Sequence, residues 1–132
     1  MASEAVVVET PTVIRDFTVA DGATIEQFTL CKLADARLAT ASSGADVFAG
    51  IAMTEKEAGD GQVNLGLAQD GIFDLTCTAL AGVTLGHMVV LSGANLIRDA
   101  VAAELLTGAV VGKALETGTA SEVIEVDIGV RG

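Results

Sequence analysis

The stretch that decides the fold class reads Val47-Phe-Ala-Gly-Ile-Ala-Met53, then an acidic, glycine-rich loop at 54–61, then Val63-Asn-Leu-Gly-Leu67. Asp70-Gly71 follows, and the segment Ile72–Cys77 comes directly after it. The first segment is apolar throughout, as in a strand covered on both faces, and the second alternates, as in a strand with one buried face. An Asp-Gly pair between such segments predicts a hairpin turn. This stretch therefore predicts consecutive β-strands joined by tight turns.

The same pattern continues on both sides. Apolar or alternating segments predict further strands at Arg15–Val19, Thr24–Leu33, Arg37–Thr40, His87–Leu91, Leu96–Ala100, Ala109–Leu115 and Glu122–Val130. Val101–Leu106 fits a short helix or another connection, and no segment has the long periodicity of an amphipathic helix. We expect an all-β fold with at most one or two short helices, built as a compact small barrel or sandwich.

A weak internal repeat links two of these segments. Ala49-Gly-Ile-Ala52, a glycine-rich turn and the alternating run 63–67 recur as Val111-Gly-Lys-Ala114, a turn at 116–119 and the alternating run 124–128. Both units predict a strand–turn–strand hairpin, which fits a pseudo-symmetric barrel or sandwich. In the last strand, Glu125 alternates with apolar residues, so this hairpin should have one wet and one dry face.

Length limits the number of folding units. A chain of 132 residues buries about two thirds of its unfolded surface in one core. We expect a single β-rich domain at 13–132 after an extended N-terminal arm at 1–12. Cys31 and Cys77 lie in apolar, strand-like runs, which favours buried structural thiols over a disulfide or a reactive thiol.

The arm has two interpretations. Ala5-Val-Val-Val-Glu-Thr10 is rich in β-branched residues, and Pro11 lacks an N–H and keeps the residue before it extended. It is either a first edge strand with a frayed terminus, or a segment that becomes ordered by adding a strand to a partner. For the second case the candidate contact residues are Val6, Val7, Val8, Thr10 and Pro11.

Charge excludes some partners. Eighteen acidic residues against seven basic ones give a net charge of −11, and the basic residues are scattered singly. Binding to nucleic acid or to an anionic membrane needs clustered Lys and Arg, so neither is expected. The chain also begins without the features of a signal peptide, and no apolar run approaches the ~20 residues that cross a bilayer.

Catalytic and metal-binding patterns are not found. His87 is the only histidine, and it lies in the apolar run 86–91. No glycine-rich phosphate loop, nucleophile elbow or zinc-ligand spacing is present. Glu55, Glu57 and Asp60 resemble half of a calcium loop, but the ligand spacing and the final bidentate Glu are missing. They fit a solvated acidic turn or a weak cation site. We predict no catalytic, cofactor-binding or metal-binding residues, and no enzyme.

The chain resembles a family of small phage head-decoration proteins. The resemblance rests on the order of Val47–Met53, the acidic turn, Val63–Leu67 and Gly71-Ile-Phe-Asp-Leu75, and on the later segments 86–91, 110–114 and 123–130. It implies a non-enzymatic β-rich homotrimer that binds the major capsid protein on the outer surface of a virion, after synthesis in the host cytoplasm. It also implies three-fold and quasi-three-fold positions, and an arm that adds a strand to the capsid lattice.

Three alternatives stay open. A tail or connector component of a virion has the same composition, although a long tube-forming hairpin is missing. A small trimeric β-fold enzyme of the nucleotide-hydrolase type would use aromatic residues at its site, yet this chain contains no Trp and no Tyr. The third alternative is a cellular binding module.

Overall fold

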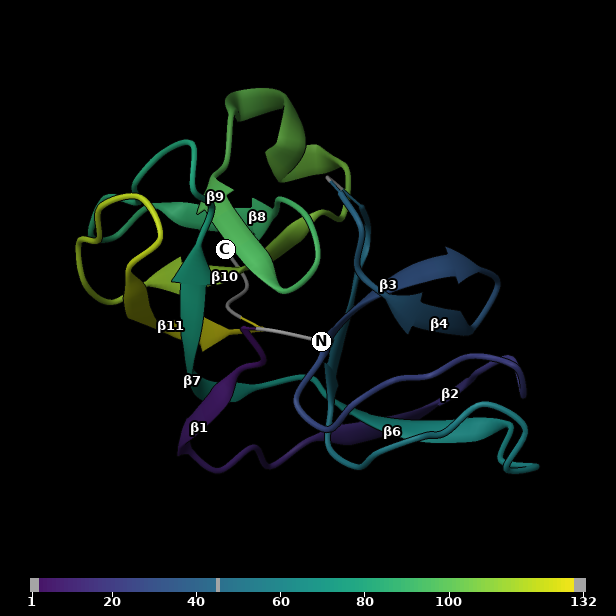
Figure 1. The fold of residues 1–132 in the computed structure, drawn as a ribbon. Coiled ribbons are helices and arrows are strands. Elements are labelled where there is room, and N and C mark those ends of the chain that lie inside the picture. The colour runs from purple at the N-terminus through teal and green to yellow at the C-terminus, as the bar shows by residue number, and fades with distance from the viewer. Residues whose placement is uncertain (1–2, 45, 130–132) are drawn as a thin grey trace.

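The computed structural model describes residues 3–44 and 46–129, and in this part of the chain the strands form two closed β-barrels in tandem (Figure 1). The first barrel contains β2 (Ile14–Thr18), β3 (Leu30–Asp35), β4 (Leu38–Ala41), β5 (Phe48–Ala52) and β6 (Asn64–Ala68). The second contains β7 (Gly71–Cys77), β8 (Met88–Leu91), β9 (Leu96–Asp99), β10 (Val110–Ala114) and β11 (Val123–Ile128). β1 (Val6–Glu9) extends the second sheet beyond β7, and a short 3₁₀ helix, η1 (Ala102–Leu106), connects β9 to β10. The predicted all-β fold is confirmed.

Both barrels have the same strand connectivity. In each barrel, the first strand pairs antiparallel with the fifth and parallel with the third, which places Thr18 beside Leu38 and Thr76 beside Leu96. The fifth strand pairs with the fourth, the fourth with the second, and the second with the third. The hairpin repeat in the sequence is therefore one part of a structural repeat that extends from β2 to β11.

The barrel interiors repeat position by position. Nine matched positions line each interior, and all of them are apolar. In the first barrel they are Phe17, Val19, Ile25, Cys31, Ala39, Ala49, Ala52, Leu65 and Leu67; in the second they are Leu75, Cys77, Val83, Val89, Ile97, Val111, Ala114, Ile124 and Val126. Burial of these side chains is the main force that closes each barrel.

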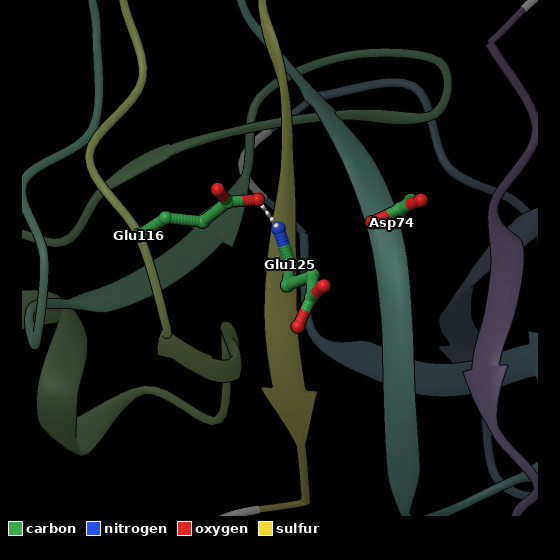
Figure 2. A group of neighbouring side chains, drawn as sticks. All are labelled: Asp74, Glu116 and Glu125. Carbon is green, nitrogen blue, oxygen red and sulfur yellow. Dashed lines mark hydrogen bonds between the residues drawn. The ribbon is translucent and has the colours of Figure 1, made fainter.

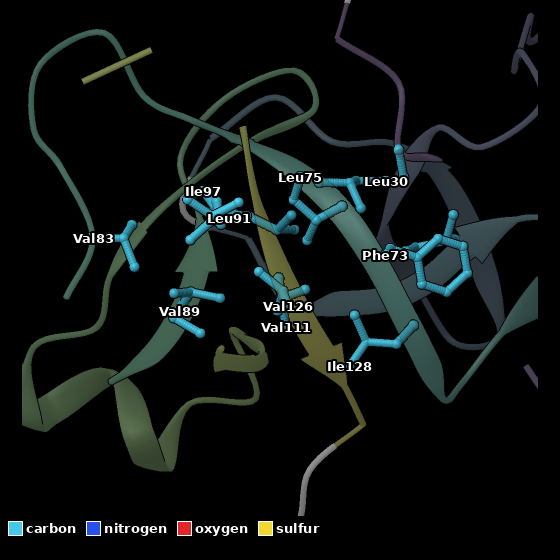
Figure 3. Close-up of a cluster of buried hydrophobic side chains, with 14 of the residues drawn as sticks. Leu30, Phe73, Leu75, Val83, Val89, Leu91, Ile97, Val111, Val126 and Ile128 are labelled. Carbon is cyan, nitrogen blue, oxygen red and sulfur yellow. The ribbon is translucent and has the colours of Figure 1, made fainter. Parts of the chain in front are cut away.

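One apolar cluster spans both barrels. Leu30, Ile51 and Ala68 of the first barrel are buried in the same cluster as Phe73 and the interior of the second barrel (Figure 3). The interior of the first barrel forms a separate cluster, so this shared cluster joins the second barrel's interior to the side of the first barrel that faces it. The two barrels are therefore held together by side-chain burial as well as by the chain that connects them.

A polar connection crosses the same boundary. Asn95, at the β8–β9 turn, is fully buried, and its Oδ1 accepts a hydrogen bond from the backbone N–H of Leu30 at 2.8 Å. The hydroxyl of Ser42 donates to the carbonyl oxygen of Gly93 at 2.9 Å and accepts from the N–H of Asn95 at 3.2 Å. These bonds fix the second barrel's turn against β3 and β4 of the first.

One predicted strand is wrong in its extent. The alternation in Thr24–Leu33 predicts a continuous strand, but β3 begins only at Leu30. Phe28 has a φ of 66°, which breaks the extended conformation, and its N–H donates to the carbonyl oxygen of Ala52 at 2.6 Å. The alternating pattern before β3 comes from a loop whose apolar residues, such as Ile25, point into the barrel.

The Asp70-Gly71 turn is not a hairpin. β6 and β7 belong to different barrels, so this dipeptide connects the two units. Gly71 has a φ of 107°, and a Cβ there would lie 2.9 Å from the carbonyl oxygen of Glu9. The turn therefore needs glycine for its own conformation and for the close approach of the N-terminal segment.

The remaining predicted strands are confirmed, with ends shifted by at most two residues. Val130, the predicted end of the last strand, lies outside the described residues. The wet and dry faces of β11 are also confirmed, because Ile124, Val126 and Ile128 are buried while Glu125 and Asp127 are partly exposed. Among the described residues, no helix has the length and apolar character needed to span a bilayer.

Candidate functional site

The described part of the N-terminal segment forms an edge strand of the chain's own second barrel. β1 pairs antiparallel with β7, with Val6 opposite Asp74 and Val7 opposite Phe73. Val7 packs against the apolar cluster that spans the barrels, whereas Val6 and Val8 expose 58% and 43% of their surface. The extended conformation predicted for this segment is present, and its strand partner in this structure is β7.

The other two candidate contact residues differ in exposure. Thr10 is exposed, but Pro11 is buried against the connection between the barrels. The carboxylate of Asp70 then accepts hydrogen bonds from the N–H groups of Thr12 and Val13, at 2.8 and 2.9 Å, and from the Thr12 hydroxyl. That hydroxyl and these N–H groups lower the pKa of Asp70. Val6, Val8 and Thr10 are thus accessible to a partner, while Pro11 is part of an anchored turn.

The acidic loop at 54–61 contains a buried lysine, Lys56, whose ammonium group lies among oxygen atoms of the loop. Lys56 is completely buried, and its Nζ donates to the carbonyl oxygens of Asp21 and Glu57, at 2.9 and 3.0 Å, and to Oδ1 of Asp60 at 2.8 Å. The hydrogen bond from Lys56 is the largest cause that lowers the pKa of Asp60 to about 2. Of the acidic residues that resemble half of a calcium loop, Asp60 thus accepts from the Lys56 ammonium group with its carboxylate and Glu57 with its backbone carbonyl.

A cluster of three carboxylates lies on the outer face of the second barrel (Figure 2). Asp74 on β7 is directly opposite Glu125 on β11, and Glu116 follows the end of β10. Ligand oxygens of the three residues lie within 4.8 Å of one another, and the N–H of Glu125 donates to Oε1 of Glu116 at 2.7 Å. Hard cations bind such oxygens, but Ca²⁺ takes six to eight of them in typical sites.

The sequence pattern does not predict this cluster. The alternation of β11 correctly places Glu125 on the wet face, but nothing in the sequence indicates that Asp74 lies beside it. The pairing of β7 with β11 joins residues about fifty positions apart, and only the closed barrel brings them together.

The histidine and the cysteines form no catalytic group among the described residues. Nδ1 of His87, which is more than half exposed, lies 3.2 Å from Oδ2 of Asp99. Cys31 and Cys77 are buried free thiols, as predicted. Burial raises the pKa of Cys31 to about 12 and also raises that of Cys77. Neither thiol has the lowered pKa of a reactive cysteine.

Large apolar side chains are exposed around the second barrel. Leu80 and Leu106 expose 93% and 91% of their surface, and Leu85, Val101 and Val123 are more than half exposed. Single exposed apolar residues are ordinary, but several of them on loops and on η1 are typical of a surface that contacts a partner.

No protein-family model matches this sequence, and no curated protein is significantly similar to it. The interpretation of function therefore depends on the residues and on the geometry described above.

Proposed function

We propose that this chain is a structural protein of a tailed-virus particle that decorates and stabilises the outer surface of the capsid. Its partner is the major capsid protein, which it binds as a homotrimer at three-fold and quasi-three-fold positions. The sequence resemblance to head-decoration proteins supports this proposal, and the all-β fold of the described residues agrees with it.

The observation that carries the proposal is the exposed edge strand β1. In the described part of the chain, β1 is the last strand of its sheet, and it exposes the side chains of Val6 and Val8. An exposed strand edge with apolar side chains pairs readily with another strand. β1 can therefore offer main-chain hydrogen bonds and apolar contact to the capsid lattice while both barrels keep their cores.

Assembly into a trimer strengthens a modest contact. Three linked copies that dock together gain effective concentration, because the second and third contacts become intramolecular. A stable trimer needs interfaces above about 1,000 Å². The exposed leucines Leu80 and Leu106 are candidates for these interfaces.

Co-sedimentation with undecorated capsids of the parent virus tests the proposal. The wild-type chain is compared with the double variant Val6→Lys/Val8→Lys, which places two charges on the exposed face of β1. Val63→Lys is the matched control, because Val63 is half exposed next to β6 and lies outside the exposed apolar surface around the second barrel. These variants are preferable to removal of residues 2–12, which would take the buried Ala5 and the packed Val7 from the cluster that spans the barrels.

Saturable binding at a fixed ratio to capsid subunits, weakened in the β1 variant and kept in the control, is the expected result. Equal binding of all three forms would keep the decorating role and exclude β1 as the contact. Absence of binding by the folded wild-type chain would contradict the role and favour a tail component or a cellular module. A thermal shift with nucleotide and Mg²⁺ would instead indicate the enzyme alternative.

A further inference from the structure

The structural repeat reveals a strand edge that is filled in one barrel and open in the other. In the second barrel, β1 pairs with the first half of β7, at Ile72–Asp74. The matched segment of β2 is Ile14–Asp16, because the two strands have the same partners in their barrels. Among the described residues, no strand pairs with this segment on the side away from β6.

The backbone of this segment is oriented to receive a strand. The N–H of Val19 donates to the carbonyl oxygen of Val63 across to β6, and alternate residues of an antiparallel strand repeat this direction. The intervening residues Ile14 and Asp16 therefore point their N–H and C=O groups away from β6. The same alternation in β7 turns Asp74 toward β1.

The side chains at the matched positions of β7 and β2 differ in exposure. Phe73 of β7 is completely buried, whereas Arg15, its counterpart in β2, is exposed. Ile14 exposes 51% of its surface. An apolar side chain and an unpaired strand edge are thus accessible together, which is the combination that strand addition uses.

Two guanidinium groups belong to the same edge. Arg15 lies in the segment, and Nη2 of Arg37 donates to the carbonyl oxygen of Asp16 while its guanidinium lies 5.6 Å from the ring centre of Phe17. The guanidinium groups of Arg15 and Arg37 outnumber the one carboxylate of the segment, Asp16. In a chain with seven basic and eighteen acidic residues, this small local excess of positive charge favours a partner segment that carries a carboxylate. Arg37 also caps one backbone acceptor of the edge, which protects the free protein from indiscriminate pairing.

We propose that the Ile14–Asp16 edge of β2 accepts one extended, acidic strand from the capsid subunit, bound antiparallel as β1 is bound to β7. An apolar side chain of that strand packs on Ile14, and a carboxylate pairs with Arg15 and, after it leaves Asp16, with Arg37. In the described part of the chain, β1 is the one strand outside both barrels, and it already fills the β7 edge; the occupant in this proposal therefore comes from another protein. This inference rests on the proposed function. In it the chain accepts a strand from the capsid subunit, whereas β1 would add a strand to the capsid.

Hydrogen exchange on decorated capsids, with three forms of the full chain, tests the proposal. The amides of Ile14 and Asp16 should exchange at least about tenfold more slowly in the capsid-bound wild type than in the free protein. Arg15→Glu should weaken capsid binding about tenfold, the loss expected for one charge-assisted contact. Lys113→Glu, the same charge change on an exposed residue of β10, should leave binding unchanged.

Three other outcomes would overturn the inference in different ways. Wild-type binding without protection at Ile14 and Asp16, together with full binding of Arg15→Glu, would exclude this edge while the decorating role stands. Protection that appears in the free protein as its concentration rises would show that a second copy of the chain fills the edge. Absence of any binding by the wild type would exclude both the decorating role and the capsid strand.

Discussion

The two barrels differ in their edges and in their connections, although they share one topology and one set of interior positions. The second barrel has an added edge strand, β1, while no strand within 3–44 and 46–129 pairs with the matched edge of the first. In the first barrel, an isolated β-bridge joins Lys56 to Ile25, which lies in the loop before the second strand. In the second barrel, the matched bridge joins Gly118 to Val83. The connection before the fourth strand is longer in the second barrel and contains η1. What the barrels share specifies the fold, so the differences are where specific binding should be sought.

The largest expected effect is a loss of stability at Phe73, on β7, the strand that β1 pairs with, compared with Arg15 at the matched position of β2. Phe73→Ala should destabilise the protein by about 3–5 kcal/mol, because it removes a fully buried aromatic ring from the cluster that joins the barrels. Arg15→Ala, at the matched and exposed position, should change the free energy of unfolding by less than about 0.5 kcal/mol. Urea unfolding of both variants measures the difference. Similar losses for the two would mean that the first barrel's edge is also covered in solution.

The second effect concerns Lys56, which has no counterpart in the second barrel. Lys56→Met should cost about 2–3 kcal/mol, below the usual loss for a broken buried ion pair, because Asp60 is partly exposed to water. Lys32→Met is the matched control, since Lys32 pairs with Ser43 and Asp46 at the surface and should cost less than about 1 kcal/mol. Thermal or urea unfolding of both variants checks the order.

The loss of stability at low pH provides an independent test of the ion pair between Lys56 and Asp60. The folded-state pKa of Asp60 is lowered from 3.8 to about 2, so its contribution is present above pH 3.8 and is lost as the pH falls through about 2. In Lys56→Met this part of the pH dependence should become smaller. An unchanged loss of stability at low pH in the variant would mean that Lys56 does not control the ionisation of Asp60.

The strand pattern was predictable from sequence because burial in a small barrel imposes alternation on each strand. The prediction that a strand begins at Thr24 was wrong, because Ile25 points into the barrel from a loop and gives the same alternation as a strand. The hairpin repeat was visible because Gly50 and Gly112 recur at matched positions, opposite Cys31 and Val89. The first half of the repeat was not visible, because its interior positions exchange one apolar residue for another.

The candidate sites were less predictable than the strands. The sequence indicated an extended segment at Val6–Val8, but it left open whether the segment pairs within the chain. Lys56 reads as one charge among several in an acidic loop, and its burial follows only from the approach of residue 21 to that loop. The open edge of β2 has no sequence signal, since it is defined by the absence of a neighbour that β7 has.

A smaller effect distinguishes the two turns that connect the second and third strands. Asn95 and Arg37 occupy matched positions with φ of 61° and 53°. Asn95→Ala should cost about 1–3 kcal/mol, because the buried N–H of Leu30 loses its acceptor. Arg37→Ala, which affects an exposed residue, should cost less than about 1 kcal/mol. Differential scanning calorimetry would test this order, and a reversed order would argue against the polar connection between the barrels.

The smallest expected effect has the opposite sign. Asp74 and Glu125 are like charges directly opposite each other on β7 and β11, a pairing that destabilises a sheet. Asp74→Asn should therefore stabilise the protein by about 0.2–1 kcal/mol at low salt, and high salt should reduce the gain by screening the repulsion. Asp127→Asn is the control, because Asp127 lies opposite Lys113 and its neutralisation should give no gain. If Asp74→Asn were destabilising, and Ca²⁺ stabilised the wild type more than the variant, the three carboxylates would be binding a cation rather than repelling one another.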